Sequence, residues 1–360
     1  MDHQVEEIVE KYQLETRETT LAVGGGFCLN CPTNAYLMKK YRFKRFQAPP
    51  CINDGGQALG IGLYEFYRRM GQFSFSFGEN PFRGVAPKIS VERIKMLKET
   101  SFVEKVTQYT AKQAANDLIK DVVVWFEDGA EIGPRALGHR SLLGNPTNPR
   151  TKKRLNEIKK REFWRPVAPI VKVEEGDEYF EQLLPSPFML HTFRLRPEWK
   201  ERLESISHID GTARVQTVKK DCLETQKICE ILDEMKKIVG VPIICNTSLN
   251  DKGEPIIETM ERALDFAMEK KIVCVYINGW RIQLKNFDQY QGEFKEAGIP
   301  FVVEDSDKKI QFNPWNIEEE SIRYILHKDR NRFDLSDKKD VEKAIQYIKK
   351  KKNRSLLYHE

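Results

Sequence analysis

Residues 121–128 read DVVVWFED, a run of five β-branched or aromatic residues with charged residues at both ends. Such side chains favour strands, and a short apolar run of this kind is typical of a strand that is buried on both faces. The segments VGVPIICN (239–246) and KIVCVYING (271–279) have the same character. Because these strands alternate with helical patterns, strongest at residues 107–119, the sequence predicts an α/β fold in which residue 121 opens a second domain.

The first 70 residues repeat the alternation of helix and strand on a smaller scale. The patterns predict an amphipathic helix at residues 5–12, a short strand at 19–23 and helices at 34–40 and 61–70. Residues 71–87 are rich in Phe, Ser, Gly and Pro and predict a loop. After about residue 285 the chain becomes charged and ends near four consecutive lysines, which is typical of a solvated tail.

The composition excludes several classes of protein. The 360 residues, 40% hydrophobic and 31% charged, suffice for two globular domains. The net charge of +5 is the small difference between 59 basic and 54 acidic side chains, too weak to indicate nucleic-acid binding. The acidic start MDHQVEEIVEKYQ is unlike a signal peptide, and no uncharged run approaches the roughly 20 apolar residues of a membrane span. Seven cysteines without a secretory signal indicate reduced thiols, so we expect a cytoplasmic protein.

The stretch GGGFCLNCPTN (24–34) allows several interpretations. Its glycines can bring backbone N–H groups close to an anion at a helix start, or they can form a tight turn without a ligand. Its Cys28 and Cys31 could be half of a zinc site, but the chain has no second C-x2-C pair. We therefore favour two small packing residues, with a redox pair as the alternative.

Basic side chains gather among glycines and prolines in the stretch EIGPRALGHRSLLGNPTNPRTKKRLNEIKKREFWRPVAP, residues 131–169. They include Arg135, Arg140, Lys159, Arg161 and Arg165. Their spacing is unlike that of an amphipathic surface helix, and several guanidinium groups presented from loops suit the oxygens of a polyanion. This stretch therefore predicts binding of phosphate groups.

Two further motifs place polar residues next to strands. HIDGTARVQTV supplies His208, Asp210 and Arg214, and NTSLN supplies Asn246, Ser248 and Asn250 directly after a buried strand. Short polar side chains at the end of a strand commonly point into a cleft. Each of these residues alone could be structural, but together they predict one binding site in the second domain.

These motifs resemble those of the NodU/CmcH/TobZ-type O-carbamoyltransferase family. The resemblance runs from about residue 21 to 283 and includes GGGFCLNCPTNAYL, INDGGQALGIGLY, GPRALGHRSLLGNP, IKKREFWRPVAP, SPFML, HIDGTARVQTV and VPIICNTSLNDKGEPI. The combination of GPRALGHRS, HIDGTARVQ and NTSLN is specific, whereas the glycine–asparagine stretch alone is not.

The resemblance implies a partial actin-like ATPase (TsaD-like) lobe at residues 1–97, a YrdC-like α/β domain at 98–286 and a charged extension at 287–360. The YrdC-like domain is expected to convert carbamoyl phosphate and ATP, as its Mg²⁺ complex, to carbamoyl-adenylate and pyrophosphate. The TsaD-like domain is expected to pass the carbamoyl group to a hydroxyl of a small molecule or glycan.

The resemblance also implies roles for individual residues. Lys159, Arg165, Ser248 and Asn250 match the YrdC-type signature, and fixed cations stabilise anionic reactants and leaving groups. The expected catalytic residues are Lys159, Arg165, Arg135 and Arg214; the expected substrate- or nucleotide-binding residues are Ser248, Asn250, Asn246, His208, Asp210, Gly24, Gly25, Gly26 and Asn30; and Asp54 is the expected metal ligand.

One departure from the family pattern concerns the metal. The chain begins near the second half of the TsaD-like domain, and its six histidines contain no H-x3-H pair to bind Fe²⁺ or Zn²⁺ with Asp54. We therefore expect a partner protein that supplies the missing half. The alternatives are a protein that forms carbamoyl-adenylate or hydrolyses carbamoyl phosphate without transfer, and a non-catalytic binding subunit.

Overall fold

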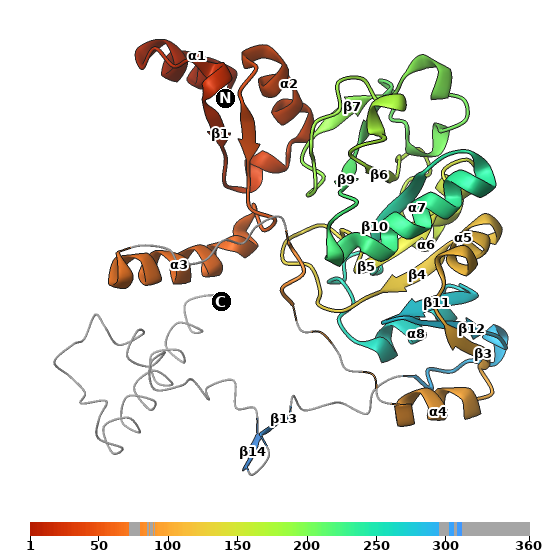
Figure 1. Ribbon diagram of the computed structural model, residues 1–360. Helices are drawn as coiled ribbons and strands as arrows, with labels where there is room; N and C mark the ends of the chain where they lie inside the picture. Colours follow the sequence, from red (N-terminus) through yellow and green to blue (C-terminus); the bar gives the residue numbers. More distant parts are fainter. Residues whose placement is uncertain are drawn as a thin grey trace, which may run out of the picture. The chain divides into compact units, whose positions relative to one another are not determined.

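The computed structural model describes residues 1–71, 80–84, 86, 89, 91–294, 302–305 and 308–311 (Figure 1). The chain divides into two compact units, Met1–Lys295 and Glu296–Glu360. In the second unit the described part is a hairpin, in which β13 (Val302–Asp305) pairs antiparallel with β14 (Lys308–Gln311). The predicted loop at 71–87 lies mostly outside the described residues, and the four predicted tail lysines lie wholly outside them.

An eight-stranded mixed sheet forms the centre of the larger part of the first unit (Figure 1). The strand order is β3-β12-β11-β4-β5-β10-β6-β9. The strands are β3 (Val103–Gln108), β4 (Val123–Phe126), β5 (Arg140–Gly144), β6 (Ala168–Lys172), β9 (Gln216–Val218), β10 (Ile243–Ser248), β11 (Cys274–Ile277) and β12 (Trp280–Leu284). The pairs β4–β11 and β6–β9 are parallel and the other neighbours are antiparallel.

Helices cover both faces of this sheet (Figure 1), which confirms the predicted α/β class. Along β4, Val123 and Trp125 pack in one core with α5 and α7, whereas Val124 and Phe126 pack in the other core with α6 and α8. This alternation follows from the two-residue period of a strand. The four helices are α5 (Ala111–Lys120), α6 (Arg150–Ile158), α7 (Gln226–Val239) and α8 (Met260–Glu269).

The predicted helix at residues 107–119 is wrong at its start. Residues 103–108 form β3, because they pair with β12 in the register Gln108 to Trp280. The helix α5 begins only after Thr110, whose hydroxyl accepts the Gln113 N–H at 3.2 Å as an N-cap. Pairing with a distant strand, which local propensity does not report, decides this boundary.

The first part of the unit, residues 1–71, contains its own small sheet, in which β1 (Thr20–Ala22) and β2 (Arg45–Gln47) are parallel. Its helices are α1 (Asp2–Lys11), α2 (Cys31–Tyr41) and α3 (Gln57–Met70). The Asp2 carboxylate ties α1 to α2 by bonds to Lys40 at 2.9 Å and to the Tyr41 hydroxyl at 2.8 Å. None of the residues of α3 is buried.

Specific contacts connect this first part to residues 91–294, which include the eight-stranded sheet and which we call the sheet-containing part. From α2, the Asn34 amide donates to the Leu190 carbonyl at 2.9 Å. At a second place the backbone of Pro50 approaches Gly133 so closely that a Cβ added to Gly133 would lie 2.3 Å from the Pro50 oxygen. Gly133 also has φ of +117°, so only glycine fits this contact without strain.

The predicted limit between residues 97 and 98 falls inside α4 (Val91–Glu99). Ile94 and Leu97 of this helix belong to the same core as the large sheet. A short strand pair, β7 (Thr192–Arg194) with β8 (Thr212–Arg214), also belongs to the sheet-containing part. Among the described residues, no helix combines the length and the apolar character that crossing a bilayer requires.

Candidate functional site

Lys159, Ser248 and Asn250 form the tightest polar contact of the predicted site. Lys159 follows the last residue of α6 and is 8% exposed. Its ammonium donates to the Ser248 carbonyl at 2.9 Å, to the Ser248 hydroxyl at 3.2 Å and to the Asn250 carbonyl at 2.5 Å, and it also bonds the Asn250 side-chain oxygen. The structure thus brings together three predicted residues that lie 89 and 91 positions apart.

This contact fixes the lysine but leaves it electrostatically unusual. The Ser248 hydroxyl donates to the Asn250 side-chain oxygen at 2.6 Å, and the Asn250 amide donates to the Glu254 carbonyl at 2.6 Å. Burial, together with the nearby positive charge of Arg161, lowers the pKa of Lys159 to about 8. A lysine of this kind is held in place and is only partly compensated by neighbouring charge.

A group of three arginines, Arg135, Arg161 and Arg214, lies beside this contact. Each has one buried guanidinium nitrogen without a hydrogen-bond partner: Nε of Arg135, Nη2 of Arg161 and Nε of Arg214. Within the described parts of the chain, no carboxylate forms an ion pair with any of them. Burial and the positive charges of Arg135 and Arg161 lower the pKa of Arg214 to about 10, although the Cys31 thiol acts in the opposite direction.

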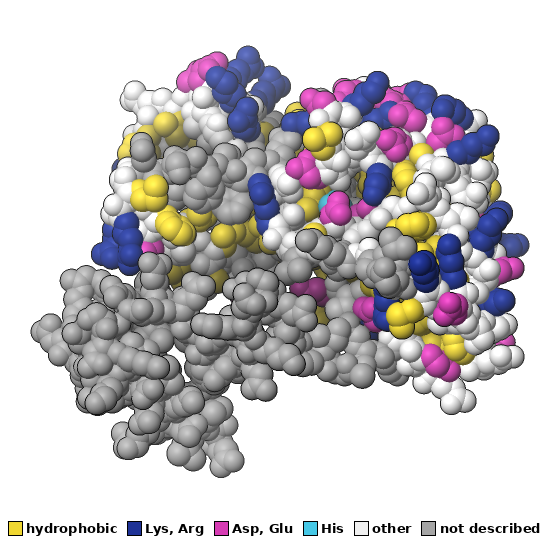
Figure 2. All heavy atoms as spheres, turned by 60° about the horizontal axis from the view of Figure 1, so that its bottom comes forward, with side chains coloured by type: hydrophobic (Ala, Val, Ile, Leu, Met, Phe, Trp, Pro, Cys, Tyr) yellow, Lys and Arg dark blue, Asp and Glu magenta, His cyan; other side chains and the backbone are white. Residues whose placement is uncertain are grey.

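We call Arg135, Lys159, Arg161 and Arg214 the basic cluster. Cations that are near one another and removed from water destabilise one another unless an anion neutralises them. A ligand with several negatively charged oxygens would satisfy the free guanidinium N–H groups. By contrast, on the face shown in Figure 2 the Lys and Arg side chains are interspersed with Asp and Glu. The basic cluster is therefore the clearest candidate for anion binding.

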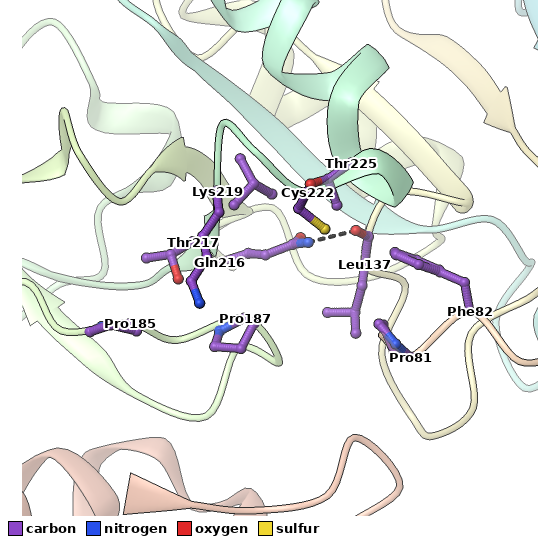
Figure 3. A pocket seen from close by; sticks show the side chains of 11 residues that line it. Pro81, Phe82, Leu137, Pro185, Pro187, Gln216, Thr217, Lys219, Cys222 and Thr225 are labelled. Carbon is purple, nitrogen blue, oxygen red and sulfur yellow. Dashed lines mark hydrogen bonds between the residues drawn. The ribbon is translucent and has the colours of Figure 1, made fainter. Parts of the chain in front are cut away.

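Asn246 is hydrogen-bonded to the loop that carries Arg135 of the basic cluster. It is 1% exposed, and its amide donates to the Ala136 carbonyl at 3.0 Å and to the Gln216 side-chain oxygen at 2.9 Å. The Gln216 amide in turn donates to the Leu137 carbonyl at 2.5 Å, the bond drawn in Figure 3. The structure thus places Asn246 against the loop that carries Arg135, where it bonds protein carbonyls.

Two cavities lie near these residues. The larger, of about 410 Å³, is lined by Ser248, Asn250, residues 254–258 and by Ala130, Glu131, Gly133 and Pro134; the members of the basic cluster do not line it, and Lys159 bonds its lining residues Ser248 and Asn250. Its volume suits a small-molecule ligand. The smaller, shown in Figure 3 with Phe82, Leu137 and Gln216 among its lining residues, has a volume of about 40 Å³. This is room for a few waters, so the larger cavity is the candidate substrate pocket.

Two further predicted arginines have protein partners of their own, although the positive charge of Arg165 helps burial to lower the pKa of Arg161. The Arg165 side chain is 51% exposed and pairs with Glu162 at 2.7 Å, so the structure does not join it to Lys159. Arg140 is fully buried and donates to the carbonyls of Glu127 at 2.5 Å and Asp128 at 2.7 Å. The expectation that Arg140 presents its guanidinium to a polyanion is wrong, because the side chain is fully buried and backbone carbonyls occupy both terminal nitrogens, although its Nε has no partner.

His208 and Asp210 lie in an exposed turn before β8. The Asp210 carboxylate accepts the Thr212 N–H at 2.9 Å and the Thr212 hydroxyl at 2.7 Å, and His208 lies 3.5 Å away. Burial works against ionisation, but the bonds from Thr212 and the nearby His208 lower the pKa of Asp210. These contacts hold the turn, and they are local rather than directed toward the basic cluster.

The predicted phosphate-binding residues of the first part are exposed. A Cβ added to Gly24, Gly25 or Gly26 would meet no atom within 4 Å, so no close approach requires the glycines, although Gly25 has φ of +95°. The Asn30 side chain accepts the Thr33 N–H at 3.2 Å and caps α2. Of the interpretations left open by the sequence, helix-start chemistry accounts for Asn30.

Asp54 has no co-ligands for Fe²⁺ or Zn²⁺ among the described residues of this chain. It is exposed at the start of the short helix η3 (Asp54–Gly56). No group of three or more His, Cys, Asp or Glu side chains in the described residues could hold a metal ion. One carboxylate alone binds such an ion poorly.

Cys28 and Cys31 are both buried, as the packing interpretation expects. The Cys31 thiol donates to the Met189 carbonyl at 3.2 Å, a contact between α2 and the sheet-containing part. Burial raises the pKa of Cys31, although the positive charges of Arg214 and Arg135 act in the opposite direction. A protonated buried thiol is a poor nucleophile and a poor metal ligand.

Sequence reasoning gave Arg161 no specific role, although it noted the residue among the basic side chains. The available signal was its position two residues after Lys159, just beyond the helix end. The Nε group of Arg161 donates to the Asn156 side-chain oxygen at 2.5 Å, which fixes the side chain. The contribution of Arg161 to the basic cluster depends on this fold-dependent placement.

The fold and the cluster together describe an α/β protein with a group of buried, unpaired cations. Residues 111–284 match the family model for the carbamoyltransferase C-terminus. A nodulation protein U of Sinorhizobium fredii is 31% identical over 254 residues, covering 71% of this chain and 44% of that protein. The chain belongs to this family of carbamoyltransferases.

A second relative agrees with this membership. A 3'-hydroxymethylcephem-O-carbamoyltransferase of Amycolatopsis lactamdurans is 33% identical over 246 residues, covering 67% of this chain and 44% of that protein. The chain thus spans less than half the length of these two relatives. Among solved structures, full-length HypF in its phosphate- and nucleotide-bound form is 20% identical with a TM-score of 0.31, covering 45% of this chain and 21% of that one.

Proposed function

We propose that this protein carries the activation site of an ATP-dependent O-carbamoyltransferase. The observation that carries the proposal is the basic cluster, in which three arginines of a carbamoyltransferase family member lack a counter-ion beside the fixed Lys159. Carbamoyl phosphate, ATP and both leaving groups of the activation reaction are anions. Preorganised cations stabilise such charges most strongly in a site removed from water.

The proposed activation has two stages, hydrolysis of carbamoyl phosphate and adenylation of the carbamate. Carbamoyl phosphate loses phosphate to water and leaves carbamate, whose oxygen attacks the α-phosphorus of ATP and displaces pyrophosphate. The product is carbamoyl-adenylate. Arg135, Arg161 and Arg214 neutralise the phosphate oxygens, and Lys159 holds charge at the edge of the larger cavity. ATP enters as its Mg²⁺ complex, which reduces the repulsion between its phosphates. Arg165 could join only after its pair with Glu162 opens.

The proposed second step transfers the carbamoyl group. An acceptor hydroxyl attacks the carbamoyl carbon and AMP leaves. The acceptor class, a small molecule or a glycan, is supported only by the name of one relative, which acts on a hydroxymethylcephem. The isolated Asp54 supplies no complete metal site for this step.

We also propose that transfer requires a protein region like the unmatched part of the longer relatives. Those relatives extend to more than twice the length that this chain matches. In this chain α3 presents large apolar side chains to solvent, among them Ile61 at 54%, Tyr64 at 66% and Phe66 at 58% exposure. Exposed apolar patches of this kind mark protein contacts. Co-purification with such a protein, and bound iron or zinc in that complex alone, would support the proposal.

Pyrophosphate release tests the activation chemistry. The wild-type chain is expected to release pyrophosphate only when ATP and carbamoyl phosphate are both present. Arg161→Ala and Arg214→Ala should each lower the rate about 10²- to 10³-fold, the effect of removing one preorganised electrostatic group. Arg150→Ala is the matched control, because Arg150 is exposed at the start of α6.

The possible outcomes separate the candidate functions. Release of phosphate without pyrophosphate would indicate a carbamoyl-phosphate hydrolase. Binding of ATP without turnover would indicate a non-catalytic subunit. Equal rates for both arginine variants and the Arg150 control, in folded protein, would remove the basic cluster from the mechanism.

A further inference from the structure

The loop that carries Arg135 is closed on itself by one carboxylate, that of Glu131. Its Oε1 atom accepts three backbone N–H groups, from Leu137 at 2.7 Å, His139 at 2.9 Å and Arg140 at 3.2 Å. A carboxylate that accepts several N–H groups makes strong, charge-assisted bonds. The chain from residue 131 to residue 140 therefore forms a closed loop, and Arg135 lies in the middle of it.

Further contacts hold the backbone of this loop near Arg135, and the His139 and Arg140 side chains bond other carbonyls, whereas the Arg135 side chain stays free. The Ser141 hydroxyl accepts the Gly138 N–H at 3.1 Å, and Asn246 and Gln216 donate to the Ala136 and Leu137 carbonyls. The Arg135 Nε has no partner. The direction of this guanidinium consequently depends on the backbone that Glu131 fixes.

We infer that Glu131 is a positioning residue that sets Arg135 for anion binding. The inference rests on the anion site proposed above and adds to it a residue that acts through Arg135, although Glu131 itself lines the larger cavity. A preorganised cation binds an anion without paying to order its own loop at that moment, which is why the supporting contacts of a site affect affinity. Glu131 is itself an anion, so its electrostatic effect on an anionic ligand has the opposite sign to its positioning effect.

This opposition of sign makes the inference testable with inorganic pyrophosphate as the ligand and calorimetric measurement of its Kd. If Glu131 acts only through its charge, both Glu131→Ala and Glu131→Gln should bind pyrophosphate more tightly than the wild type. If Glu131 positions Arg135, Glu131→Ala should bind at least about tenfold more weakly. Glu131→Gln keeps an oxygen for the three N–H groups and should stay within about threefold of the wild type.

A double variant tests whether the effect runs through Arg135. In an Arg135→Ala background, Glu131→Ala should change the pyrophosphate Kd by less than about twofold, because the positioned group is gone. An equal loss in both backgrounds, or wild-type affinity of Glu131→Ala, would overturn the inference. If Glu131→Ala does not fold, Glu131→Asp replaces it, since its shorter carboxylate cannot reach the three N–H groups. We then expect Glu131→Asp to bind pyrophosphate weakly and Glu131→Gln to bind it normally. Equal pyrophosphate affinity of these two variants would overturn the inference.

The same measurements separate this inference from the proposed function. If Arg135→Ala binds pyrophosphate as tightly as the wild type, Arg135 does not belong to the anion site, and the proposed role of the basic cluster fails at that residue. If Arg135→Ala binds weakly and Glu131→Ala binds normally, the anion site stands and only the positioning role of Glu131 is wrong.

Discussion

The predicted site residues make different kinds of contact in the sheet-containing part and in the first part of the chain. In the sheet-containing part, Lys159 bonds Ser248 and Asn250 across a long sequence separation, and Lys159 is buried while the other two are half-buried. In the first part, Asn30 and Asp54 are exposed, and Asn30 bonds only a residue three positions away. The helix-capping contact with Thr33 is sufficient to explain the presence of Asn30 without a ligand.

This difference provides a criterion for deciding whether a polar motif indicates a bound ligand. Polar residues that meet across long sequence separation, with charges left uncompensated, require an explanation beyond folding stability. Polar residues that complete a helix end have already found their partners. By this criterion we expect a ligand at the basic cluster, whereas the contact of Asn30 requires none.

The largest expected effect concerns Lys159. Lys159→Ala should lower kcat/KM for pyrophosphate release. The expected loss of transition-state stabilisation is about 2–4 kcal/mol, because one fixed cation is removed from a buried site. Lys153→Ala is the matched control, since Lys153 lies on α6, the helix that ends just before Lys159, and its side chain is 77% exposed. Wild-type rates for Lys159→Ala would remove the distinction between the two parts of the chain.

The low pKa of Lys159 adds a pH dependence to this prediction. The side chain is cationic below its pKa of about 8 and neutral above it. If the cation is required, kcat/KM of the wild type should fall as the pH rises through about 8. Lys159→Arg keeps its charge and should move this fall to higher pH. An unchanged profile would assign the fall to another group.

A smaller effect is expected where the two parts meet. His191 is buried against Phe46 of β2, at 4.4 Å between ring centroids, and near Phe193. Burial lowers the pKa of His191 from 6.5 to about 4. Between these values the unfolded chain binds a proton that the folded protein does not, so stability falls as the pH falls.

Denaturant unfolding measures this effect. From pH 7 to pH 5 the wild type should lose about 2 kcal/mol more stability than His191→Phe, which cannot take up the proton. His3→Phe serves as the control, because the His3 side chain is 82% exposed. Equal pH dependence in the wild type and His191→Phe would show that the imidazole is not buried, and the contact between the two parts would be in question.

The smallest effect is expected at Asn30. Asn30→Ala should cost about 1 kcal/mol of stability through the lost helix cap, measured by thermal or denaturant unfolding, and Asn30→Ser should restore it. Neither variant should change the affinity for ATP. If both variants fold normally and bind ATP more weakly, Asn30 contacts the nucleotide as the family resemblance implied.

Much of the fold could be predicted from local pattern. The apolar run at 121–128 is a buried strand, and α7 carries apolar residues at helical spacing and ends at Gly240, whose φ is +72°. The strand β3 could not be predicted in this way, because its pairing partner β12 lies about 170 residues away in the sequence.

The site was predictable in its residue types and less so in its geometry. Lys159 and Arg214 are basic side chains in distinctive motifs, and the structure places both in the basic cluster. The inward position of Arg140 and the supporting role of Asn246 depend on which carbonyls the fold brings within reach. No local pattern distinguishes a guanidinium that binds a ligand from one that binds the backbone.

The contact between Gly133 and Pro50 has a consequence for tolerance to mutation. No side chain can be accommodated at Gly133, because even a methyl group would overlap the Pro50 oxygen. In a saturation scan for activity, position 133 should therefore be as intolerant as Arg135, although its defect is steric. Activity alone would therefore make position 133 look like a catalytic residue, although Gly133 acts by allowing contact between the two parts of the chain. A separate measurement of folding would distinguish the steric defect from a catalytic one.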